Sequence, residues 1–156
     1  GMVPMDRSII LWGKFIFSTL GSLLVSGSLI MLSDYLLGIT GFTVAVHALI
    51  VVCVCCGLNG LAVGLGAVYP DLSTDDPSKI ISSFGGTLNL ICSITFILVT
   101  LVPVSVILHL HAVGQLKGSA WCWAITAGLA LVLFVALITV FVPMQAGIRA
   151  LRKMQF

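Results

Sequence analysis

The stretch from Phe42 to Val68 reads FTVAVHALIVVCVCCGLNGLAVGLGAV and contains no Asp, Glu, Lys or Arg. A membrane-spanning helix needs about 20 apolar residues, because the hydrocarbon core is about 30 Å thick and each residue rises about 1.5 Å. Three further runs are similar in length and composition: Phe15 to Leu37, Thr87 to Leu108 and Trp121 to Val142. We therefore expect an all-α membrane protein with four transmembrane helices.

The overall composition excludes a water-soluble globular domain. The chain has 156 residues, of which 60% are hydrophobic and 8% are charged, and its mean hydropathy is +1.24. Soluble domains carry about a quarter charged residues, so membrane lipid is the expected surrounding. The net charge of +2 is too small to indicate a nucleic-acid surface, and no nucleic-acid partner is expected.

Motifs for catalysis are absent from the sequence. It contains no GxxxxGK[ST], HExxH or GxSxG pattern, so we expect neither catalytic residues nor a cofactor, and the chain is not predicted to be an enzyme. His109 and His111 could be considered with Asp34 as metal ligands. An HxH pair with a distant carboxylate constrains geometry poorly, so solvated histidines are favoured and no metal site is predicted.

The distribution of basic residues predicts the orientation. Four spans place both termini and the middle polar segment on one side of the membrane. Lys117 is the one basic residue expected on the opposite side, and the positive-inside rule assigns the more basic side to the cytoplasm. Both termini are therefore predicted to be cytoplasmic. The basic residues on that side are Arg7, Lys14, Lys79, Arg149, Arg152 and Lys153.

Small residues recur at a spacing of four on three of the predicted spans. In lipid, small residues let helix backbones approach closely, so these stripes are predicted to be helix contacts. The alternative is that Gly and Ser are simply common in spanning helices. The stripes consist of Ser18, Ser22 and Ser26, of Gly60 and Gly64, and of Ala120, Ala124 and Gly128.

His47 and Asn59 are the conspicuous polar residues of the second predicted span. Polar side chains within a membrane usually face a bundle interior or a wet cavity, which makes both candidates for a substrate path. The favoured alternative is a hydrogen bond to a neighbouring helix. Asp34 lies near the end of the first span and is expected to reach interfacial water. A small proton-coupled exporter therefore ranks last among the functions considered.

The segment between the second and third spans is the most polar of the chain and is predicted to contain a short interfacial helix. Asp76 is a plausible N-cap and Pro77 suits the first helical position. Gly85 and Gly86 are expected to end the helix. This helix is expected either to connect two spans, with apolar residues in the headgroups, or to dock a cytoplasmic partner.

Three parts of the sequence resemble a known family. NGLAVGLGAVYPDLSTDDPSKIISSFGGTLNL, from Asn59 to Leu90, resembles permease subunits of ABC type-2 exporters, especially a bacterial exporter group. The basic tail from Ala146 to Phe156 and the P-x-x-R-x-x-x-x-x-G-K pattern from Pro4 to Lys14 are also similar to that family. The common NP dipeptide of the family is DP here, which keeps the capping chemistry.

This resemblance implies the membrane-spanning permease portion of an ATP-driven exporter in the bacterial cytoplasmic membrane. Such permeases usually have six spans, so the chain resembles the last four. It implies a coupling-like segment at 1–14, a transmembrane domain at 15–142 and a basic tail at 143–156. The implied partners are an ATP-binding-cassette ATPase subunit and a second permease half or missing N-terminal spans. The implied ATPase contacts are Pro4, Asp6, Arg7 and Lys14.

A second hypothesis comes from a different class of protein. The chain could be a self-sufficient four-span accessory or assembly protein without transport activity. Two further spans ahead of Met2, or a neighbouring gene for an ATP-binding-cassette ATPase, would favour the permease instead.

Overall fold

The computed structural model describes residues 7–69 and 84–153, and every element in these two ranges is a helix. Side chains are described from Ser8 to Tyr69 and from Phe84 to Ala150. The four helices are α1 (Arg7–Leu36), α2 (Phe42–Val68), α4 (Phe84–Ala112) and α5 (Ser119–Lys153). All four are long and apolar enough to cross a membrane, so the prediction of four helices of this length and composition is confirmed for the described residues.

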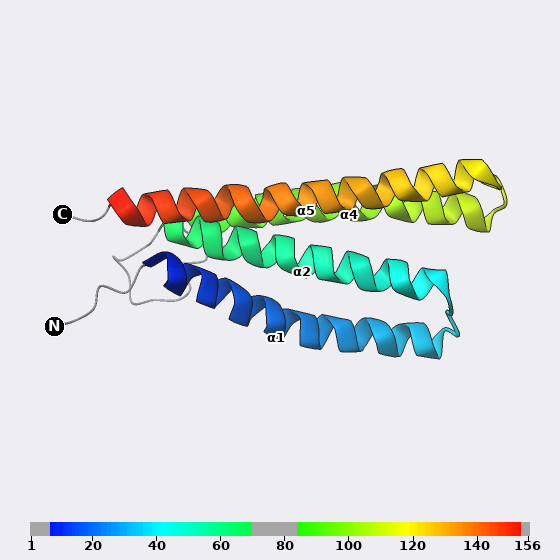
Figure 1. The fold of residues 1–156 in the computed structure, drawn as a ribbon, viewed down its shortest axis with the longest axis horizontal. Helices are drawn as coiled ribbons and strands as arrows, with labels where there is room; N and C mark the ends of the chain where they lie inside the picture. The colour runs from blue at the N-terminus through cyan, green and yellow to red at the C-terminus, as the bar shows by residue number, and fades with distance from the viewer. Residues whose placement is uncertain (1–6, 70–83, 154–156) are drawn as a thin grey trace.

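The helices lie side by side along the long axis of the molecule, and each runs antiparallel to the one before it (Figure 1). Two short connections, Leu37–Gly41 and Val113–Gly118, lie at one end, here called the hairpin end. Both connections contain glycines at positive φ, such as Gly38 at 64° and Gly114 at 78°, a conformation that glycine adopts without steric cost. The start of α1 and the end of α5 meet at the opposite, terminal end (Figure 1).

Several helix boundaries differ from the sequence prediction. α1 begins at Arg7 instead of Phe15, and α5 continues to Lys153, well beyond Val142. The added turns contain Leu, Ala, Arg and Lys, which are good helix formers and let the helices continue beyond the uninterrupted apolar runs. Gly85 and Gly86 lie inside α4, so the expectation that they end a preceding helix is wrong. The proposed interfacial helix itself falls on 70–83, outside the described residues.

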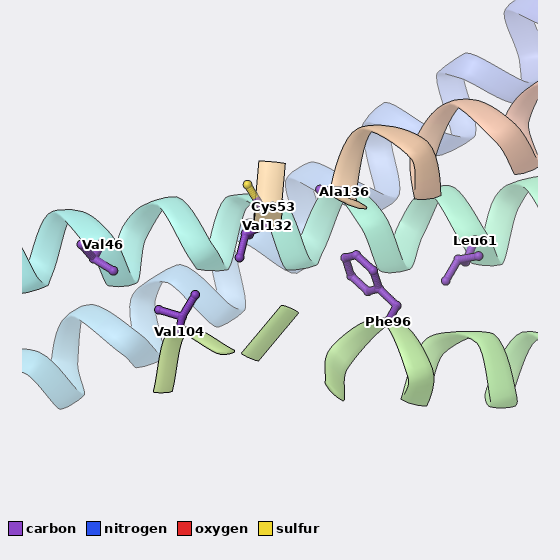
Figure 2. Close-up of a cluster of buried hydrophobic side chains, with 7 residues drawn as sticks. All are labelled: Val46, Cys53, Leu61, Phe96, Val104, Val132 and Ala136. Carbon is purple, nitrogen blue, oxygen red and sulfur yellow. The ribbon is translucent and has the colours of Figure 1, made fainter. Parts of the chain in front are cut away.

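α2 and α5 form the centre of the bundle, because each contacts all three other helices, whereas α1 and α4 do not contact each other. The main core joins α2, α4 and α5 around Phe96 and Val132 (Figure 2). A second, smaller core joins α1 to α5 through Leu11, Phe15 and Met144. The whole main core consists of Val46, Cys53, Leu61, Phe96, Val104, Val132 and Ala136.

Glycines on α2 allow the close approach of its neighbours. A Cβ added at Gly60 would lie 2.8 Å from the Cα of Val140, and one added at Gly64 would lie 2.5 Å from the backbone of Pro143. A Cβ at Gly57 would collide with the ring of Phe96. The GxxxG face of α2 therefore packs on α5, and Gly57 extends this small-residue surface to α4.

Large apolar side chains cover the outside of the bundle. Phe17 on α1 is 82% exposed and Phe134 on α5 is 63% exposed. Apolar exposure on this scale is costly in water and favourable in lipid. The exposed surface and the helix lengths together support an integral membrane protein.

Candidate functional site

A groove of about 850 Å³ lies between α1, α2 and α4. It exists because α1 and α4 both pack on α2 without contacting each other. Most of its lining is Ile, Leu and Val, which suits an apolar ligand. Polar side chains interrupt this lining at Ser22, Ser26, Ser33, Asp34, His47, Asn59, Asn89, Ser93 and Ser105.

Asn59 joins α2 to α1 toward the terminal end of the groove. Its Nδ2 donates hydrogen bonds to the Oγ of Ser22 and the carbonyl oxygen of Cys55, both at 2.7 Å. The Ser18 hydroxyl donates to Asn59 Oδ1. We call Ser18, Ser22 and Asn59 the Asn59 cluster. These bonds satisfy the amide inside the membrane and fix the position of α1 against α2.

Asp34 and His47 form the corresponding link at the hairpin end. His47 Nδ1 lies 2.8 Å from Asp34 Oδ1, within hydrogen-bond distance. The Asp34 side chain is only 8% exposed, and that of His47 is 28% exposed. The expectation that Asp34 reaches interfacial water is therefore wrong: the turn of the hairpin folds it against α2.

The contribution of α4 to the groove was not anticipated from the sequence. Asn89, Ser93 and Ser105 line it, and Asn89 Oδ1 is buried without a hydrogen-bond partner in the part of the chain that the structure describes. A buried unpaired acceptor costs free energy unless another group satisfies it. The recurrence of Asn89 and Ser93 at a spacing of four was the available sequence signal.

The two polar links lie at the two ends of a long, mostly apolar part of the groove. Both Ser22 to Asp34 on α1 and His47 to Asn59 on α2 span 12 residues, which corresponds to about 18 Å along a helix. Between them the lining includes Ile30, Val51 and Val54. The arrangement can hold an elongated molecule with an apolar body and a polar group at one or both ends.

The remaining residues that the sequence predicted for a substrate path or for helix packing lie on α1, α2 and α5. Both substrate-path candidates, His47 and Asn59, line the groove, and Ser26 does so from α1. On α5, Ala124 is half-buried, while a Cβ at the buried Gly128 would lie 2.9 Å from Ile107 of α4.

The predicted ATPase contacts lie at or beyond the start of α1. Pro4 and Asp6 fall outside the described residues, and Arg7 is the first residue of α1. Lys14 is exposed. The role of these residues as contacts remains a prediction.

His111, one of the two histidines considered as metal ligands, contacts the connection between α4 and α5 and the start of α5. His111 Nδ1 lies 2.9 Å from the carbonyl oxygen of Leu116. Its ring stacks on Trp121 with centroids 3.8 Å apart and planes at 17°. His111 therefore connects the end of α4 to the start of α5. In the described ranges no group of three or more His, Cys, Asp or Glu could hold a metal ion.

Comparison with models of protein families identifies the family of this chain. Residues 1–156 match the model of the family described as "Putative ATP-binding cassette". The chain belongs to this ATP-binding cassette family. No curated protein and no solved structure matches it.

Membership of the ATP-binding cassette family corrects the sequence-based identification. The family description names an ATP-binding cassette and not a permease, so the assignment to ABC type-2 exporter permeases is wrong, and so is the permease function drawn from it. The accessory-protein hypothesis is not better supported by this match. The resemblance had rested on glycine-rich spans, a capped loop and basic tails, features that membrane helices share for physical reasons. The family match is compatible with an association of this chain with ABC transporters.

Proposed function

We propose that the four helices form a membrane-embedded unit of an ATP-binding cassette system, and that the groove between α1, α2 and α4 binds an apolar or amphipathic molecule from the bilayer. The observation that carries the proposal is the groove itself, an apolar space of about 850 Å³ in a bundle whose helices are long enough to cross a membrane. Its volume lies in the range of small-molecule sites.

ATP binding is assigned in this proposal to a site outside these 156 residues. The sequence has no GxxxxGK[ST] loop, the feature whose backbone N–H groups surround the phosphates in P-loop proteins. An ATP-binding partner would meet the terminal end, where Lys14 is exposed. This chain would then bind no ATP analogue when purified alone. The expected location is the bacterial cytoplasmic membrane.

Photolabelling tests binding in the groove. The protein in lipid nanodiscs is irradiated with a long-chain alcohol that carries a diazirine, and the labelled peptides are mapped by mass spectrometry. We expect labels on residues that line the groove from facing helices, such as Val54 and Ile97. Exposed positions elsewhere, such as Phe134, report the background labelling by probe dissolved in lipid.

A pair of variants on α1 makes the test specific. Ser26 lines the groove, whereas Ser28 is exposed and bonds only to the carbonyl of Leu24. Ser26→Phe should fill the groove and lower its labelling about tenfold, which corresponds to about 1.4 kcal/mol of binding free energy. Ser28→Phe should leave the labelling unchanged. Groove labelling equal to the background, or equal labelling in both variants, would contradict the proposed function.

A further inference from the structure

Asp34 places a carboxyl group in the lining of the groove at the hairpin end. It is the one carboxylate side chain within residues 7–69 and 84–153, and no Lys or Arg is among the residues that line the groove. Its one side-chain hydrogen-bond partner in those ranges is His47, which approaches Oδ1. A carboxylate offers about four acceptor positions on two oxygens, so acceptor capacity remains after His47 has bonded.

An ionised carboxylate in a mostly apolar groove selects its ligand by charge. Transfer of an ion into a low-dielectric region is costly unless an opposite charge accompanies it. An ammonium group provides three N–H donors and a compensating positive charge. An anionic headgroup would be repelled by an ionised Asp34, and a neutral hydroxyl would bring no compensating charge.

We propose that the groove binds a cationic amphiphile, a long-chain amine whose ammonium group pairs with Asp34 and whose alkyl chain extends toward the Asn59 cluster. This proposal rests on the proposed function, because it specifies the ligand class of the same groove. The two polar links are about 18 Å apart along the helices, and the lining between them is mostly apolar, which suits an extended alkyl chain. Ser33 and Ser105, which also line the groove, supply hydroxyl oxygens as further acceptors for the headgroup.

Three photoreactive probes with the same alkyl chain test the charge preference: a primary amine, an alcohol and a carboxylic acid. Each is added at equal membrane concentration to the full chain in nanodiscs of neutral lipid, and groove labelling is divided by labelling at Phe134, which corrects for partition into the bilayer. In the wild-type protein the amine should label the groove about tenfold more than the alcohol, equivalent to about 1.4 kcal/mol. The acid should label less than the alcohol.

Asp34→Asn removes the charge and nearly preserves the shape of the side chain. It should reduce amine labelling to the level of the alcohol, while alcohol labelling stays as in the wild type and reports an intact groove. Ser28→Ala on the exposed face of α1 is the matched control and should retain the amine preference.

The outcomes separate the two proposals. Equal groove labelling by amine and alcohol in the wild type, or an amine preference that survives Asp34→Asn, would overturn the cationic ligand and leave the proposed function intact. Labelling of the groove at background level by all three probes would overturn both. Loss of alcohol labelling in Asp34→Asn would mean that the variant alters the groove. Asp34→Glu, which keeps a carboxyl group at this position, then decides the matter, because the proposal requires it to retain the amine preference.

Discussion

The imidazole Nδ1 of His47 lies 2.8 Å from Oδ1 of Asp34, and this pair joins the last turn of α1 to the second turn of α2. The two residues are 13 positions apart in the sequence, across the tight connection of the first helical hairpin. The pair lines the groove at the hairpin end and places a buried carboxyl group inside a bundle of four apolar helices.

The Asp34–His47 pair should be energetically coupled. His47→Phe leaves the buried carboxylate without its donor and should lower the free energy of unfolding by about 2 kcal/mol, within the range for hydrogen bonds to charged groups. The Asp34→Asn/His47→Phe double variant should lose less than the sum of the two single variants. Unfolding in mixed micelles of increasing denaturing-detergent fraction measures these free energies. Strict additivity would contradict a direct interaction.

Asn59 should contribute to the contact between α1 and α2. Asn59→Ala removes the hydrogen bonds to Ser18 and Ser22 and should cost about 0.6 to 1.7 kcal/mol, as measured for interhelical hydrogen bonds in membranes. Thr95→Ala is the control, because the exposed Thr95 hydroxyl bonds only within α4, to the carbonyl of Ile91. The same micelle titration measures the free energy of unfolding of both variants. Comparable losses in the two would contradict an interhelical contribution of Asn59.

Gly64 and Gly66 offer a matched test of helix packing on one helix. A Cβ at Gly64 would meet the backbone of Pro143 at 2.5 Å, whereas a Cβ at Gly66 has no neighbour within 4 Å. Gly64→Ala should therefore destabilise the bundle by about 1 to 3 kcal/mol through overpacking. Gly66→Ala should be neutral or stabilising by up to about 1 kcal/mol, because Ala has the higher helix propensity. Thermal unfolding in detergent compares them, and equal effects would place the Gly64 face away from α5.

The sequence was sufficient to predict the helices but not the partners of their polar residues. Long uncharged runs specify spanning helices because their length must match the bilayer. The burial of Asp34 could not be read from composition, since it depends on how tightly Leu37–Gly41 turns and on which face of α2 carries His47. The extension of α1 to Arg7 and of α5 to Lys153 was missed because a helix can continue beyond its apolar part.

The groove was the feature least accessible to sequence reasoning. It requires that α1 and α4 flank α2 without touching, a relation between helices distant in the sequence. His47 and Asn59 were identified as polar residues of interest, but the sequence does not reveal that Asn89 and Ser93 of α4 face the same space. The glycine stripe at Gly60 and Gly64 was visible in the sequence, whereas its partner helix was not.

Orientation can be tested by labelling from each side of the membrane. In a variant with all five native cysteines replaced by alanine, single cysteines at Lys79 and Lys117 should react with an impermeant maleimide from opposite sides. The reason is that Lys79 lies in the sequence between α2 and α4, and Lys117 lies between α4 and α5. A cysteine added at the C-terminus should behave like Lys79. Reaction of Lys79 and Lys117 from the same side would contradict the four-span topology.

The central claim, that the groove binds an amphiphile, is tested most directly by nuclear Overhauser effects between a protonated long-chain amine and methyl groups of the protein in nanodiscs of deuterated lipid. The account predicts contacts from the alkyl chain to Val54 and Ile97, which line the groove from α2 and α4. It predicts no comparable contacts to Ile16 and Leu133, whose side chains are exposed on the outside of the bundle. Contacts of equal intensity to both sets of methyl groups would contradict it, because the amine would then be only dissolved in the surrounding lipid.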